Sequence, residues 1–149
     1  MRGRQSKSML KTTTHNLIRH ILQTAESIAI VGISPKSERP SNQVASYLLE
    51  AGYTIIPVNP GQKEILGQKC YPSLKSIPDS IDIVGIFRKP AHIPPIVEEA
   101  IQIKASVVWM QEGIINEKAA SRARRAGLTV IMDRCLKTDH LNLVKHRFI

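Results

Sequence analysis

Cysteine is scarce in this sequence, with two residues among 149 and no CxxC pair. Cys70 and Cys135 therefore predict neither a disulfide framework nor a cysteine zinc site, which favours a reducing compartment. No apolar run approaches the roughly 20 residues that span a bilayer, and residues 1–11 lack the apolar stretch of a secretory signal. We expect a cytoplasmic protein without a membrane partner.

Aromatic residues are also few, with one Trp, three Tyr and two Phe, although the formal net charge is +9. The charge lies mainly at the ends, since residues 1–20 hold five basic and no acidic side chains and residues 137–149 hold three basic and one acidic. The stretch between them is nearly neutral. Without an aromatic stacking surface, such ends predict weak, salt-sensitive attraction to polyanions and no specific nucleic-acid partner.

What the sequence does contain is a series of short apolar runs rich in Ile and Val. They are continuous rather than alternating, as in strands buried on both faces of a parallel sheet. Five such runs predict five strands: Ile28–Val31, Tyr53–Val58, Ile81–Phe87, Ala105–Met110 and Leu128–Ile131.

Helical patterns separate these strands and precede the first one. One lies over Leu17–Ala25, one begins at an N-cap Ser41 and ends before Gly52, one begins at Pro94, and one runs from an N-cap Asn116 to Gly127. Residues 61–80 predict a loop with at most a short helix. The alternation predicts an α/β fold, a three-layer Rossmann-like doubly wound sheet of about five parallel strands. We assign it to residues 14–140, between a basic, disordered tail (1–13) and a C-terminal tail (141–149).

Ligands of such folds bind beyond the carboxyl ends of the strands. The first strand is followed by a loop in which Gly32 permits a tight turn, Ser34 offers a hydroxyl, and Lys36 and Arg39 are cationic. Together with the next helix N-terminus, this loop suits a phosphate group. The G-x-G-x-x-G fingerprint of dinucleotide-binding folds is absent, because Ser34 stands in place of its second glycine.

The other strand ends carry further candidates. The second strand ends at Val58, Asn59 and Pro60, without the carboxylate that holds the ribose of NAD. The third ends at Phe87, Arg88 and Lys89, where Arg88 suits a phosphate. The fourth is followed by Gln111, which suits a base or amide, and Gly113, which permits close backbone approach.

The residues do not assemble into a recognisable catalytic set. A catalyst needs a nucleophile or an acid–base pair within hydrogen-bond reach. His92 follows the third strand and lies near the ligand edge, but a lone histidine in a turn is more often structural. Cys135, near His140, follows a buried strand, where inert thiols are common. We expect no enzyme and no metal.

The segments IAIVGISPKSERPSNQVASYLLEAGYTIIPVNPGQKEILGQKCYPSL, IDIVGIFRKP and VVWMQEGIINEKAASRARRAGLTVIMDRC resemble the stand-alone CoA-binding family of small bacterial proteins. These proteins are relatives of the CoA-binding domain of the succinyl-CoA synthetase α subunit. The resemblance covers about Thr14 to His140. Two positions depart from the family pattern: Gly85 replaces an expected acidic residue, and Glu112 stands where an apolar residue is common.

The resemblance implies a non-catalytic module that binds coenzyme A or an acyl-CoA. It assigns Gly32, Ser34 and Arg39 to the diphosphate and residues 58–60 to the adenosine side, with residues 87–89 at the next strand end. Gln111 and Gly113 would border the diphosphate and pantetheine. From the residues alone, NADP or a free nucleotide fits the same loops. The alternatives are therefore an NAD(P)-linked oxidoreductase-like protein and a nucleic-acid accessory protein acting through its basic ends. A small Rossmann domain of this kind is compatible with a homodimer, although no residue requires one.

Overall fold

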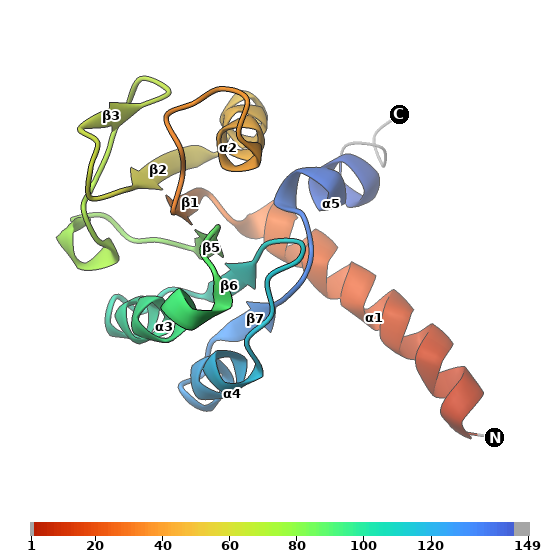
Figure 1. The fold of residues 1–149 in the computed structure, drawn as a ribbon. Coiled ribbons are helices and arrows are strands. Elements are labelled where there is room, and N and C mark those ends of the chain that lie inside the picture. The colour runs from red at the N-terminus through yellow and green to blue at the C-terminus, as the bar shows by residue number, and fades with distance from the viewer. Residues whose placement is uncertain (1, 145–149) are drawn as a thin grey trace.

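The computed structural model describes residues 2–144, and a five-stranded parallel sheet forms its centre (Figure 1). The strand order is β2-β1-β5-β6-β7, so the chain winds from β1 first to one side of the sheet and then to the other. The strands are β1 (Ser27–Val31), β2 (Thr54–Val58), β5 (Ile83–Ile86), β6 (Val107–Met110) and β7 (Thr129–Ile131). The five predicted strands and the Rossmann-like fold class are confirmed.

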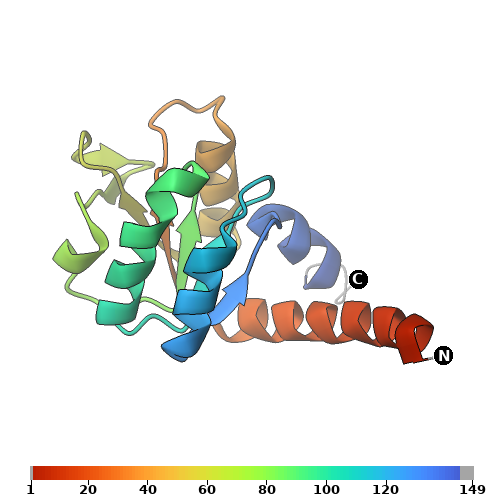
Figure 2. The same ribbon diagram turned by 60° about the horizontal axis from the view of Figure 1, so that its bottom comes forward.

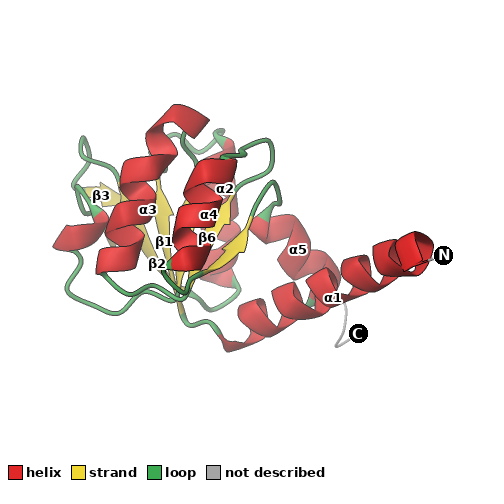
Figure 3. Cartoon of the chain, turned by 90° about the horizontal axis from the view of Figure 1, so that it is seen from below, coloured by secondary structure: helices red, strands yellow, loops and turns green. Residues whose placement is uncertain are grey.

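Two layers of helices cover the sheet (Figure 3). One layer contains α1 (Arg2–Thr24), α2 (Pro40–Glu50) and α5 (Leu136–Leu143). The other contains α3 (Ile93–Gln102) and α4 (Glu117–Arg125). Each layer shares a core with one face of the sheet: Trp109 is fully buried on the α1 side and Val84 on the α3 side. Burial of both faces explains why the strands are continuously apolar.

The N-terminus of α4 agrees with the sequence prediction, whereas the N-terminus of α2 differs from it. Asn116 caps α4 as predicted, since its side-chain oxygen accepts a hydrogen bond from the Ala119 amide. The predicted N-cap Ser41 is wrong, because Arg39 occupies that position and Pro40 the first turn. Ser41 is buried, and its Oγ accepts a hydrogen bond from the Ser34 amide, 2.9 Å away. Its hydroxyl fixes the preceding loop instead.

Several short elements lie in the connections, and the sequence prediction allowed for only one of them, a short helix within residues 61–80. Residues 61–80 contain a small hairpin of β3 (Glu64–Ile65) and β4 (Gln68–Lys69), then a 3-10 turn, η1 (Leu74–Ser76). A second 3-10 turn, η2 (Pro90–His92), leads into α3. Strands of two residues are too short to produce a hydrophobic period.

The two ends of the domain also differ from the prediction. Helix α1 continues back to Arg2, through residues assigned to a disordered tail, because no proline interrupts residues 2–24. Helix α5 extends to Leu143 and Val144 is buried, so only residues 145–149 of the expected C-terminal tail lie outside the description. Among the described helices, none has the length and apolar character needed to cross a membrane.

Candidate functional site

The carboxyl ends of β1, β2 and β5 meet at one edge of the sheet. Val31 at the end of β1 is paired with Val58 of β2 on one side and Ile86 of β5 on the other. The chain reverses its winding direction between β1 and β5, the place where doubly wound folds leave a crevice.

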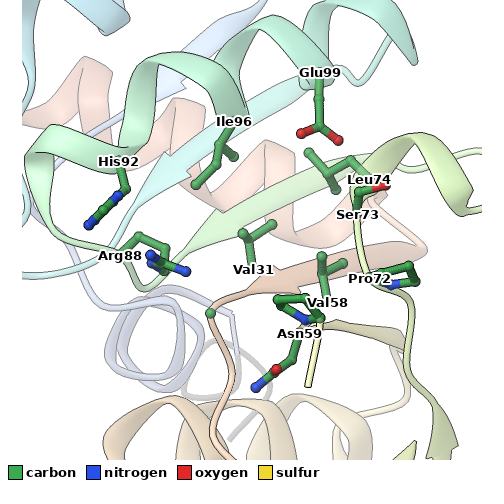
Figure 4. Close-up of a pocket in the computed structure, with 12 residues that line it drawn as sticks. Val31, Val58, Asn59, Pro72, Ser73, Leu74, Arg88, His92, Ile96 and Glu99 are labelled. Atoms are coloured by element: carbon green, nitrogen blue, oxygen red, sulfur yellow. The ribbon is translucent and has the colours of Figure 1, made fainter. Parts of the chain in front are cut away.

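A cleft of about 510 Å³ opens at this edge (Figure 4). Its lining comes from the three strand ends, the segment before and within η1, and one face of α3. The lining residues are Val31, Gly32, Val58, Asn59, Pro60, Pro72, Ser73, Leu74, Arg88, His92, Ile96 and Glu99. Five of them were predicted from the sequence: Gly32, Val58, Asn59, Pro60 and Arg88.

Gly32 and Arg88 pack against each other at the junction of β1 and β5. Gly32 has φ 86, a conformation that favours glycine. A Cβ atom there would lie 2.6 Å from the Phe87 carbonyl oxygen and 2.7 Å from Arg88 Cδ. The absence of a side chain at residue 32 thus lets the Arg88 side chain lie across the end of β1.

Arg88 is the cation that the described structure leaves available in the cleft. Its guanidinium has no hydrogen bond or ion pair with any described residue, and Figure 4 shows it inside the cleft near His92. A planar guanidinium can donate two parallel hydrogen bonds to a phosphate.

The loop between β1 and α2 is held rigid by its own polar groups. Ser34 Oγ accepts from the Lys36 amide at 3.1 Å, and the buried Asn42 side chain donates to the Ser34 carbonyl at 2.9 Å. Asn59, directly after β2, also holds this loop, since its Nδ2 donates to the Ile33 carbonyl at 2.9 Å and its Oδ1 accepts from the Gly61 amide. Ser34 and Asn59, predicted as ligand groups, have these side-chain contacts within the protein.

The first turn of α2 lies directly after this loop. The amides of Ser41 and Asn42 have no partner among the described residues, as is usual in the first turn of a helix. Lys36 and Arg39, both exposed, lie in the same loop. Unpaired amides, the helix dipole and two cations make this a favourable place for an anion.

The opposite end of the cleft has different chemistry. The middle is apolar: Ile96 lies on one side and Val58 and Pro72 on the other in Figure 4. Beyond them lies Glu99, whose Oε1 accepts a hydrogen bond from the Lys75 amide at 3.3 Å. The cleft therefore runs from a cationic end to a carboxylate.

The remaining predicted residues lie outside the lining of this cleft: Ser34, Lys36, Arg39, Phe87, Lys89, Gln111 and Gly113. Phe87 is half-buried against the core. Gln111 is buried and its Oε1 accepts from the Leu136 amide at 3.1 Å, while the Gly113 amide donates to Asp133 at 2.6 Å. Gln111 Oε1 and the Gly113 amide thus each have a partner within the fold.

Six lining residues were not among the candidates named from the sequence: Val31, Pro72, Ser73, Leu74, Ile96 and Glu99. Pro72, Ser73 and Leu74 belong to residues 61–80, whose sequence has no hydrophobic periodicity. Ile96 and Glu99 do have a signal, because with His92 they recur at i, i+4 and i+7 along one face of α3. Their separation from Arg88 along the chain concealed that they share a cleft.

The Cys70 thiol and the buried His140 have hydrogen-bond contacts within the fold. Burial raises the pKa of the Cys70 thiol, whose Sγ donates to the Asn59 carbonyl. His140 Nδ1 lies 2.8 Å from the Tyr47 hydroxyl, between α5 and α2. In the part of the chain that the structure describes, no three His, Cys, Asp or Glu residues are grouped to hold a metal ion.

Comparison with known proteins identifies the family to which the chain belongs. A family model described as "CoA binding domain" matches residues 26–141. The uncharacterized protein YneT of Bacillus subtilis is 45% identical over 123 residues, which cover 83% of this chain and 91% of that protein. A solved structure of a hypothetical protein from Pyrococcus horikoshii OT3 is 46% identical, with a TM-score of 0.85, and the match covers 87% of this chain and 92% of that one.

A second kind of relative is much longer. The ADP-forming acetate–CoA ligase I of Archaeoglobus fulgidus is 29% identical over 119 residues, which cover 73% of this chain and 17% of the ligase. This chain thus corresponds to a small part of that enzyme.

Proposed function

The chain belongs to the CoA binding domain family, and on that premise we propose that it binds coenzyme A or an acyl-CoA as a non-catalytic module. The observation that carries the proposal is the Arg88 guanidinium, which lies in the cleft beside Gly32 without a partner among the described residues. A buried or half-buried cation without a partner is costly unless a ligand or solvent compensates it.

In the proposed complex, the nucleotide part of coenzyme A occupies the cleft. The diphosphate lies against the Gly32 loop and the free amides of Ser41 and Asn42, where the α2 dipole favours negative charge. Arg88 binds the phosphate on the ribose. Lys36, Arg39 and Lys89, which are exposed around the same edge, supply long-range attraction that salt weakens.

The proposal of binding without turnover rests on the groups near the cleft. Burial raises the pKa of the Cys70 thiol, which keeps that thiol protonated and poorly nucleophilic at neutral pH. His92 lines the cleft without a nucleophile hydrogen-bonded to it among the described residues. In the ligase of Archaeoglobus fulgidus the matching region is a minor part of the enzyme, which fits a role in holding the cofactor.

Isothermal titration calorimetry of the purified protein tests the binding. We expect saturable heat with coenzyme A and with acetyl-CoA, and much weaker binding of NADP and ADP. No heat with either CoA compound would refute the proposal, and tighter binding of NADP would favour an oxidoreductase-like protein. Incubation with acetyl-CoA should release no thiol above the buffer control, since release would show turnover.

Substitution of Arg88 tests its assigned role. Arg88→Ala should weaken the binding of coenzyme A about tenfold or more, because a charge-assisted contact contributes roughly 1.5–3 kcal/mol. The binding of dephospho-CoA, which lacks the phosphate on the ribose, should weaken much less. Equal losses for the two ligands would reassign Arg88 to the diphosphate. Arg125→Ala, an exposed arginine of α4 outside the cleft lining, is the matched control and should change neither affinity.

A further inference from the structure

One face of α3 presents three different chemistries to the cleft in a fixed order. His92 precedes the helix, Ile96 lies in its middle, and Glu99 lies near its end, at i, i+4 and i+7. At a rise of 1.5 Å per residue, the first and last are separated by about 10 Å along the axis. A purine nucleoside spans a comparable length.

The other walls of the cleft follow the same order. Arg88 lies at the His92 end, Val31 and Val58 line the middle, and Leu74 lies beside Glu99, as Figure 4 shows. A ligand complementary to this sequence of groups has an anion at one end, a flat apolar body, and a hydrogen-bond donor at the other end. Adenosine with a phosphate on its ribose has this order of groups, and its donor is the amino group at C6.

Glu99 is positioned to accept from such a donor. Its Oε1 is held by the Lys75 amide of η1, whereas its Oε2 accepts no hydrogen bond from any described residue. The neighbouring Glu98 is different, because both of its oxygens accept from Arg122, at 2.8 and 3.1 Å. One of the two adjacent carboxylates is therefore committed to α4, and the other faces the cleft.

We propose that Glu99 is a specificity residue that reads the exocyclic amino group of the adenine base. The proposal rests on the proposed function, which places the nucleotide of coenzyme A in this cleft. A base with a carbonyl oxygen at the same position would set that oxygen against the carboxylate, and like partial charges repel. Glu99 thus selects for adenine by attraction and against 6-oxo purines by repulsion.

The test compares coenzyme A with an analogue whose C6 amino group is replaced by hydrogen, so that only the donor is lost. Calorimetry of the wild-type protein should show about tenfold weaker binding of the analogue, the factor expected for one charge-assisted hydrogen bond. Glu99→Ala should bind both ligands with equal affinity. Glu99→Gln, which keeps an acceptor without its charge, should retain only part of the preference.

Glu98→Ala is the matched control, because it removes a neighbouring carboxylate that does not line the cleft, and it should keep the full preference. Equal affinity of the wild-type protein for the two ligands would overturn the role of Glu99 and leave the proposed function intact. A preference that persists in Glu99→Ala would overturn it as well. Failure of the wild-type protein to bind coenzyme A at all would refute the proposed function itself, and this inference with it.

Discussion

At the scale of single residues, glycines decide how closely side chains and helices pack against the strands. Gly85 of β5 is an example, because a Cβ there would lie 3.1 Å from Leu136 Cδ1 and 3.3 Å from Ile30 Cδ1. From the resemblance described in the sequence analysis, we expected an acidic residue at this position. Leu136 of α5, fully buried, occupies the space above it. A carboxylate in this apolar contact would be desolvated without a partner, so the apolar packing of α5 explains why glycine is suitable here.

Gly32 is the residue on which the cleft depends most directly. We expect Gly32→Ala to abolish measurable coenzyme A binding, because its Cβ would displace the Phe87 carbonyl and the Arg88 side chain. Backbone strain at φ 86 should also lower the free energy of unfolding by roughly 1–3 kcal/mol. Calorimetry and urea unfolding measure the two effects.

Gly52 provides the control for this substitution. It has φ 105, and a Cβ at that position meets nothing within 4 Å. Gly52→Ala should therefore introduce strain without a clash, so that stability falls while affinity for coenzyme A is unchanged. If Gly32→Ala bound coenzyme A normally, the close packing of Gly32 on Arg88 would not matter for the ligand.

At the scale of elements, the sequence predicts those parts of the fold whose pattern is local. The β strands are continuously apolar because both faces are buried, and α4 is delimited by a capping Asn116 and by Gly127, which has a positive φ. Helix α5 escaped prediction because its eight residues include only three apolar ones, Leu136, Leu141 and Leu143, whose spacing does not form a helical stripe. The β3–β4 hairpin is too short to have a pattern at all.

The residues of the candidate site likewise separate into those that a local pattern predicts and those that only tertiary packing brings to the cleft. Gly32, Val58, Asn59, Pro60 and Arg88 follow directly from the rule that ligands bind at carboxyl strand ends. Pro72 to Leu74 and Glu99 reach the cleft through tertiary packing of η1 against α3, which no local pattern shows. Conversely, Gln111 lies at a strand end as predicted, but α5 folds over it and takes its Oε1 as a hydrogen-bond acceptor.

An ion pair links Arg134, which precedes helix α5, to Asp139 in the first turn of that helix. Arg134 Nε and Nη2 donate to Asp139 Oδ2 and Oδ1, both at 2.8 Å, and the Asp139 side chain is 6% exposed. The hydrogen bonds to Asp139 raise the pKa of Arg134. The Arg134 carbonyl also accepts from the buried Trp109 indole at 2.8 Å. The pair therefore connects α5 to the core.

Asp139→Asn should lower the free energy of unfolding by about 1–3 kcal/mol, because it removes the charge from a buried partner of Arg134. Urea unfolding followed by circular dichroism measures the loss. Glu98→Gln is the comparison, since that carboxylate pairs with Arg122 where the two side chains are 48% and 45% exposed, and exposed pairs contribute at most about 1 kcal/mol. Equal losses for the two variants would show that burial does not strengthen the Arg134–Asp139 pair.

At the scale of the whole molecule, the basic N-terminal segment and the cleft lie at opposite edges of the sheet. Helix α1 leads into the amino end of β1, whereas the cleft lies beyond the carboxyl ends of the strands. Figure 2 shows the N-terminal part of α1 extending away from the domain, and residues 1–11 contain four basic and no acidic residues. The helix joins the core only further on, through residues such as Ile18 and Leu22.

This separation predicts that attraction to nucleic acid and binding of coenzyme A are independent. Removal of residues 1–11 should abolish weak retention of the protein on a DNA column and leave the coenzyme A affinity unchanged. The slope of the logarithm of the DNA-binding constant against the logarithm of the salt concentration should become shallower, by at most about 3.6 for the loss of four phosphate contacts. Retention that survives the deletion would place the nucleic-acid contacts on the domain body, and a simultaneous loss of coenzyme A affinity would show that α1 supports the cleft across the sheet.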